Sequence, residues 1–185
     1  DLTADMRSQF DAFLKRVPEV DALLDDSQKT LAFLERFSGS DQPRKYLVLF
    51  QNSSELRPTG GFPGSYGLLT MSNGVITDWR ADDIYNPDGQ IKTLVVPPVQ
   101  LQHITPGWGM RDAAWFADFP ASAKKVMEFW QKGGGAAVDG VLAIRPEVLA
   151  QALRVTGPIS MPEYGITLTA DNALTTIQSE VEEQK

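Results

Sequence analysis

The chain has 185 residues, a net charge of -7, 42% hydrophobic residues and no cysteine. A hydrophobic share of this size supports one folded domain with a buried core, and the excess of acidic residues disfavours general binding of nucleic acids. The absence of cysteine excludes disulfides, thiolate catalysis and zinc–cysteine sites. Because His103 is the single histidine, most histidine-based metal sites and catalytic triads are disfavoured.

The two ends of the chain indicate a fragment. It begins at Asp1 without a methionine and stops at Lys185 within a polar, helical run, so we expect it to be part of a longer protein. No run reaches the roughly 20 apolar residues that cross a bilayer, and none resembles a signal peptide. A membrane anchor would therefore lie ahead of Asp1.

Residues 1–37 carry apolar side chains at helical spacing in two runs, one on either side of Pro18. Because proline ends or kinks a helix, this pattern predicts an amphipathic helical hairpin over residues 1–40, with a linker at 38–43. Two interpretations stay open for the hairpin. It packs on itself or on the main domain, or it forms a stalk or partner-binding segment.

Residues 41–185 read as one α/β domain that is truncated at its C-terminus. The continuous apolar run at 46–50 predicts a buried strand, and Asn73-Gly74 predicts the turn of a hairpin between strands at 65–71 and 75–79. Residues 86–109 predict a loop of a length that is often used for binding.

The later elements alternate between helix and strand. Asp118 or Ser122 is expected to cap the first of the helices, and three glycines, residues 133–135, end it. Helices alternating with strands predict a mixed sheet flanked by helices. The expected elements are a helix at 121–132, a strand at 138–144, a helix at 146–154, a strand at 159–161 and a final helix from 169.

Residues 52–64 form the densest cluster of candidate site residues. Gly60 and Gly61 let backbone N–H groups face an anion, which the planar guanidinium of Arg57 can bind as well. The alternative is a tight connection that depends on glycine, with Arg57 paired to an acid such as Glu55. Further polar groups in this cluster are Asn52, Ser53, Ser54 and Thr59.

Two smaller clusters follow. Asp82 and Asp83 could hold Mg²⁺ while Arg80 contacts phosphate oxygens, or the three residues form a solvated loop with a surface ion pair. Arg111 and Asp112 precede Trp115, Phe116 and Phe119. These aromatic residues are expected either in the core or as an apolar wall for a lipid or sugar.

Two long motifs resemble an uncharacterised prokaryotic family, domain of unknown function family 4012. They are YLVLFQNSSELRPTGGFPGSYG at residues 46–67 and RDAAWFADFPASAK at 111–124, and VDGVLAI at 138–144 and TGPISMP at 156–162 extend the match. The resemblance covers about residues 45–180. It implies a membrane helix ahead of this region and hence an extracytoplasmic domain anchored to the membrane.

The order of elements is also similar, more distantly, to the LytR-CpsA-Psr family, whose members transfer glycopolymers from polyprenyl-pyrophosphate carriers to the cell wall. Residues 51–57 match its early loop with an acid and an arginine, and Arg80 with Asp82 matches its arginine–aspartate pair. Gly157-Pro158-Ile159 stands where that family has Gly-Gly-Val. Ala81 separates Arg80 from Asp82, and Ser65-Tyr66 replaces the family's Ser-Asp.

These resemblances imply a three-layer α/β fold in the cell envelope that binds a phosphorylated, polyprenyl-pyrophosphate-linked glycan. Arg57, Arg80 and Arg111 would hold the pyrophosphate and act as the catalytic residues of a phosphotransferase, and Asp82 or Asp83 would help to bind Mg²⁺. The binding residues would be Asn52, Glu55, Thr59, Gly60, Gly61, Asp112 and Trp115. The alternative is a non-catalytic surface scaffold or protein-interaction domain, and the oligomeric state stays open.

Overall fold

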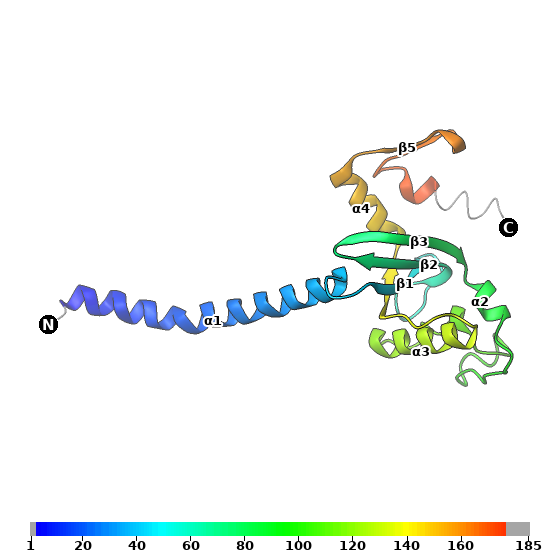
Figure 1. Ribbon diagram of the computed structural model, residues 1–185, viewed down its shortest axis with the longest axis horizontal. Helices are drawn as coiled ribbons and strands as arrows, with labels where there is room; N and C mark the ends of the chain where they lie inside the picture. The colour runs from blue at the N-terminus through cyan, green and yellow to red at the C-terminus, as the bar shows by residue number, and fades with distance from the viewer. Residues whose placement is uncertain (1–2, 177–185) are drawn as a thin grey trace. The chain divides into compact units, whose positions relative to one another are not determined.

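The computed structural model describes residues 3–176 (Figure 1). The chain forms two units. One contains the residues up to Arg44 together with Met71–Ile76, and the other contains Lys45–Thr70 and the residues from Thr77 onward. Among the described residues, no helix combines the length and the apolar character that a membrane span requires.

The N-terminal segment is one helix, α1 (Ala4–Ser38), so the predicted hairpin is wrong. Thr3 caps its start by accepting a hydrogen bond from the Met6 amide, and Gly39 ends it in the left-handed conformation with φ 71°. Pro18 lies inside the helix. A proline removes one backbone hydrogen bond, but no glycine or asparagine stands beside Pro18 to form a turn, so the helix continues through it.

The main sheet has four strands in the order β3-β2-β1-β4. β1 (Arg44–Asn52) pairs in parallel with β4 (Gly140–Ile144), with Tyr46 opposite Gly140 and Phe50 opposite Ile144. β2 (Phe62–Ser72) and β3 (Val75–Asp83) are joined by the predicted turn. Asn73 and Gly74 both have positive φ, 51° and 76°, which is the geometry that a two-residue hairpin turn requires.

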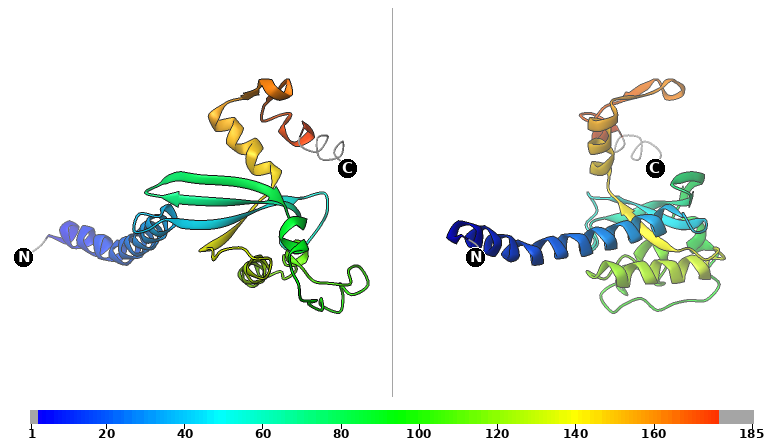
Figure 2. Two further views of the ribbon diagram at one scale, coloured as in Figure 1. Left: turned by 45° about the vertical axis from the view of Figure 1, so that its right-hand side comes forward. Right: turned by 60° about the vertical axis from the view of Figure 1, so that its left-hand side comes forward.

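Helix α3 (Phe119–Lys132) covers one face of this sheet (Figure 2). Asp118 rather than Ser122 caps it, because the Asp118 carboxylate accepts a hydrogen bond from the Ala121 amide at 3.1 Å. Ser122 is buried and bonds the backbone of Phe116 instead. The core between sheet and helix consists of Leu47, Leu49, Tyr66, Leu68, Ile84, Met110, Ala113, Val126, Phe129 and Trp130.

The predicted loop at 86–109 begins with a short helix, α2 (Tyr85–Gly89), and leads to a 3-10 turn at Met110–Asp112. Ile84, Met110 and Ala113 are fully buried, so both ends of this segment are fixed to the core. The segment between them is largely irregular, as the abundance of proline and glycine predicts.

The C-terminal elements have their own small core. Helix α4 (Pro146–Thr156) begins with proline as predicted, and β5 (Ile159–Met161) pairs antiparallel with β6 (Ile166–Leu168), a strand that the sequence pattern did not predict. Ala150, Leu153 and Ala173 are buried together. The final helix begins at Ala173, and its predicted continuation beyond 176 lies outside the described residues. The predicted α/β fold with a mixed sheet and flanking helices is confirmed.

Candidate functional site

Polar groups of the glycine-rich loop after β1 bond to neighbouring parts of the chain. The buried amide of Gln51 donates to Thr59 Oγ1 at 2.8 Å, and Thr59 in turn donates to the carbonyl of Ala114 at 3.3 Å. A Cβ atom at Gly61 would collide with the Asn52 carbonyl oxygen. Glycine is therefore needed here for a close backbone contact, which is the structural alternative for this loop.

The other candidates in the loop also have local partners. Asn52 Oδ1 accepts from the Ser54 amide at 3.0 Å, and the Glu55 carbonyl accepts from the Phe62 amide at 2.9 Å. The Arg57 guanidinium lies 5.0 Å from the centre of the Phe62 ring and donates to the neighbouring Leu56 carbonyl. Arg57 thus lies on its own loop, while its positive charge acts on Asp112.

Arg111 is bound on several sides. Its guanidinium contacts the Asp88 carboxylate at 3.1 Å and the Asp112 carboxylate at 3.4 Å, and it donates to Thr105 Oγ1 at 3.2 Å. Its charged group also lies 5.3 Å from the centre of the Tyr85 ring. An arginine with these partners fixes the 3-10 turn in place and has few donors left for a ligand.

Asp88 is a structural residue that the sequence pattern did not single out. Its side chain is 5% exposed and accepts hydrogen bonds from the backbone amides of Met110 at 2.5 Å and Arg111 at 3.3 Å. A Cβ atom at Gly109 would come within 2.6 Å of this carboxylate. The carboxylate therefore fixes the end of the long loop to α2.

Burial raises the pKa of Asp112 above the usual aspartate range; the charges of Arg111 and Arg57 counteract this rise, and Asp88 adds to it. Folded Asp112 therefore keeps its proton to a higher pH than in the unfolded chain. Between the two pKa values the native state binds more protons, so stability falls as the pH rises. Trp115, the last candidate of this cluster, is half-buried ahead of α3.

We expect this titration to appear in the difference between wild type and Asp112→Asn. The unfolding free energy of wild type, relative to the variant, should decrease as the pH rises from about 4 through the folded pKa. Urea unfolding of both proteins at several pH values, from about 3.5 to about 7, measures this difference. A difference that is constant or grows with pH would contradict the role of burial.

Asp82 and Asp83 shape the chain at the end of β3. Asp82 Oδ1 accepts from the Asp83 amide at 2.8 Å and from Asn86 Nδ2 at 2.6 Å, and Asp83 Oδ1 accepts from the Tyr85 amide at 2.8 Å. In residues 3–176 no three acidic or histidine side chains are grouped to hold a metal ion. The Mg²⁺ site at these carboxylates stays a prediction.

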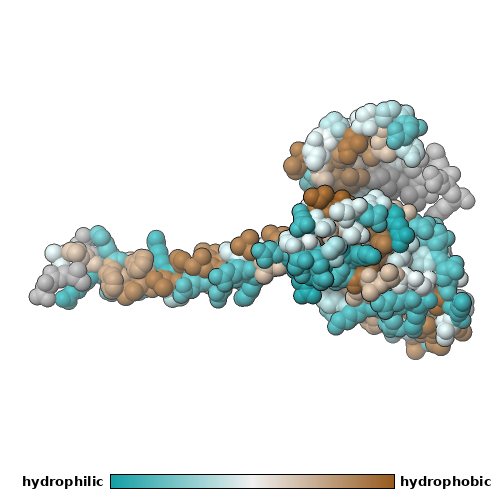
Figure 3. All heavy atoms as spheres, in the orientation of Figure 1, coloured by the Kyte–Doolittle hydropathy of each residue, from teal (hydrophilic) through white to brown (hydrophobic). Residues whose placement is uncertain are grey.

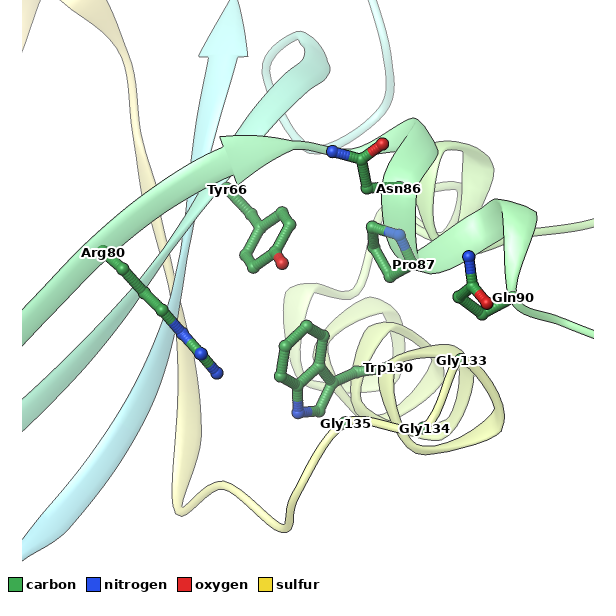
Figure 4. Close-up of a pocket in the computed structure, with 9 residues that line it drawn as sticks. All are labelled: Tyr66, Arg80, Asn86, Pro87, Gln90, Trp130, Gly133, Gly134 and Gly135. Carbon is green, nitrogen blue, oxygen red and sulfur yellow. The ribbon is translucent and has the colours of Figure 1, made fainter.

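Arg80 lies at a different place from Arg57 and Arg111, in a pocket of about 290 Å³ (Figure 4). Its side chain and that of Tyr66 project from neighbouring strands toward Trp130. The residues that line this pocket are Tyr66, Arg80, Asn86, Pro87, Gln90, Trp130 and Gly133, Gly134 and Gly135.

A second pocket, of about 520 Å³, shares Gln90, Gly133 and Gly134 with the first. Lys92 and Lys132 are among the residues that line it. Because the two pockets have these residues in common, they adjoin each other, with Arg80 lining the first and the lysines lining the second. We call the two pockets together the Arg80–Lys92 groove.

The groove contains charged and polar groups that the protein itself leaves open. Within residues 3–176, neither Arg80 nor Lys92 makes an ion pair or a hydrogen bond through its side chain, and the Tyr66 hydroxyl has no hydrogen-bond partner. Burial raises the pKa of Tyr66, and the charge of Asp82 adds to this effect while that of Arg80 opposes it. Tyr66 therefore stays a neutral hydrogen-bond donor near neutral pH.

The three glycines at the end of α3 shape the wall of the groove. A Cβ atom at Gly133 would lie 2.6 Å from the Pro87 carbonyl oxygen, and one at Gly135 would collide with the Trp130 indole. Their amides bond to the last carbonyls of α3. These backbone donors are thus already used, and a bound anion would have to be held by side chains.

Arg80 is among the residues that the sequence predicts for a site, and its neighbours in the groove are not. The sequence pattern predicted Tyr66 as a strand residue and Trp130 as part of the apolar stripe of α3. Gln90 and Lys92 lie in a predicted loop that has no recognisable motif. The one feature of the sequence that pointed to this region was the length of the loop at 86–109. Long loops are often used for binding, but the length does not indicate which residues bind.

A comparison with known protein families places most of the chain in one of them. The family described as "Protein of unknown function (DUF4012)" matches residues 41–181, which is most of the chain. Neither the search of curated proteins nor the search of solved structures gave a match.

Proposed function

We propose that this chain, which belongs to the family described as "Protein of unknown function (DUF4012)", binds a phosphorylated glycan in the Arg80–Lys92 groove. The observation that carries the proposal is the presence of unpaired cationic side chains, Arg80 and Lys92, in two pockets that share a wall. Both side chains are exposed, so their charges can be reached by a ligand that supplies negative charge.

The size and lining of the groove suit a ligand with both phosphate and sugar parts. A volume of about 290 Å³ on one side and about 520 Å³ on the other is in the range of small-molecule sites. Arg80 presents the planar fork that pairs with phosphate oxygens. The edges of Tyr66 and Trp130 and the amides of Asn86 and Gln90 provide apolar surface and neutral hydrogen bonds for sugar hydroxyls.

The proposal concerns binding and assigns no transfer step. Arg111, the arginine expected beside a reacting phosphate, has its donors on Asp88, Asp112 and Thr105. Following the implied family context, we place this binding outside the cytoplasm, in a protein anchored by a segment ahead of Asp1, and with a polyprenyl-pyrophosphate carrier as the extended form of the ligand.

The test is titration calorimetry with three probes: inorganic pyrophosphate, N-acetylglucosamine, and geranyl-pyrophosphate-linked N-acetylglucosamine. We expect saturable binding of the linked probe that is at least about tenfold weaker in Arg80→Ala, since a hydrogen bond to a charged group contributes about 1.5–3 kcal/mol. Lys92→Ala should weaken binding as well. Titrations with Mg²⁺ and with EDTA show whether the metal participates.

Lys124→Ala is the matched control, because it removes one positive charge from an exposed position of α3 outside the groove. It should leave affinity unchanged. Arg57→Ala separates the groove from the glycine-rich loop. Binding that is lost in Arg57→Ala and kept in Arg80→Ala would move the site to that loop, and no binding of any probe by the folded protein would leave a scaffold as the better interpretation.

A further inference from the structure

Helix α1 carries an apolar seam with the spacing of a coiled coil. Figure 3 shows brown, apolar atoms along the helix. All seam positions except Ser27 are apolar, and Met6, Phe13 and Leu24, for example, are 50%, 63% and 56% exposed. The seam advances in alternating steps of four and three residues through Met6, Phe10, Phe13, Val17, Val20, Leu24, Ser27, Leu31 and Leu34.

This spacing averages 3.5 residues, whereas a straight α-helix has 3.6 residues per turn. On a straight helix the seam drifts by about 20° per heptad, and two helices that supercoil around each other keep it buried. Pro18 follows the seam residue Val17 and occupies an outer heptad position. Its ring therefore lies away from the seam.

The charges beside the seam are complementary to those of a second α1. In the heptad abcdefg, Phe10, Val17, Leu24 and Leu31 occupy position a, and the other seam residues occupy position d. In a parallel pair, each g residue, which precedes an a residue, faces the e residue five positions later on the other helix. Arg16 and Asp21 occupy these positions, so each copy's Arg16 faces the other copy's Asp21. The remaining flanking pairs, Gln9–Leu14, Leu23–Gln28 and Thr30–Glu35, bring no like charges together.

An antiparallel pair lacks this match. In an antiparallel pair, g positions face g positions and e positions face e positions. Arg16 is at g and Asp21 at e, so they cannot face each other in any register. A self-complementary ion pair that forms twice is the signature of a twofold interface between identical surfaces. We propose that α1 forms a parallel, in-register, two-stranded coiled coil with α1 of a second copy of this chain. This proposal does not depend on the groove.

Sedimentation equilibrium of the full chain tests the seam. We expect a mass twice that of one chain, and a dimer dissociation constant at least about 100-fold higher in the double variant Phe13→Asp/Leu24→Asp, which places charges in the buried seam. Phe33→Asp is the matched control, since Phe33 is 62% exposed but lies off the seam. Circular dichroism verifies that the variants keep their helix.

Charge exchange tests the choice of partner. Arg16→Asp and Asp21→Arg should each weaken self-association, because each places like charges opposite one another, and an equimolar mixture of the two variants should associate again as a heterodimer. A mixture that stays as weak as the separate variants would argue against this pairing.

Cysteine crosslinking tests the orientation, and the chain has no cysteine of its own. Ser27→Cys at the seam should oxidise rapidly to a disulfide-linked dimer, because parallel copies bring the two residues 27 together. Ser8→Cys, on the outer face of the helix, should not. A monomeric wild type at about 100 µM with intact helix, a trimer, a wild type that binds lipid vesicles instead, or seam variants that dimerise normally would overturn the proposal.

Discussion

Asp88→Ala is expected to lower the free energy of unfolding by about 2–4 kcal/mol, one of the two largest effects predicted for this protein. The carboxylate is almost fully buried and accepts hydrogen bonds from two backbone amides and from the Arg111 guanidinium. Its removal leaves these donors unpaired. Because Arg111 is 26% exposed, water compensates for part of the loss, which places the effect below that of a fully buried ion pair.

Urea unfolding monitored by tryptophan fluorescence measures this change. Asp78→Ala is the matched control, because it removes an acidic side chain from an exposed position of β3 and should change stability by no more than about 0.5 kcal/mol. An Asp88→Ala protein as stable as this control would mean that the other contacts of the loop at 86–109 hold it without this carboxylate.

Phe129→Ala is expected to cost about 3–5 kcal/mol, because it opens a cavity in the core between α3 and the sheet. Phe129 is fully buried, and its ring lies 5.4 Å from that of Trp108 in an edge-to-face contact. Lys132, which lines the second pocket of the groove, lies 5.7 Å from the centre of the same ring. The substitution should therefore disturb the groove as well as the core.

Phe129→Leu keeps much of the volume and should cost less than half as much as Phe129→Ala in the same unfolding measurement. The two variants together separate loss of volume from loss of the aromatic contact. Equal destabilisation by alanine and leucine would show that ring contacts, rather than the filled volume, account for the contribution of Phe129.

Several elements could be predicted because their causes are local. Asn73-Gly74 determined the hairpin, since both residues tolerate the positive φ that the turn requires. Asp118 and Pro146 marked the starts of α3 and α4, and the apolar run in β1 marked a buried strand. Local patterns failed at Pro18, because a single lost hydrogen bond does not end a helix whose neighbouring residues favour it.

The glycine-rich loop shows why composition alone leaves function open. Gly60 and Gly61 permit either an anion-binding backbone or a close turn, and the sequence pattern is the same for both structures. Only the folded chain brings the Asn52 carbonyl against Gly61 and links Gln51 through Thr59 to Ala114. These contacts hold the loop against the end of β1 and against Ala114.

The sequence by itself determined the family, the α/β class, most strands and helices, and Arg80 as a candidate. The tertiary structure decided the rest, since the groove is assembled from residues that are far apart in the chain. Tyr66 comes from β2, Arg80 from β3 and Trp130 from α3, while Asp88 binds backbone amides more than 20 residues away. Such contacts depend on how elements pack, and packing over these separations leaves no periodic pattern in the sequence.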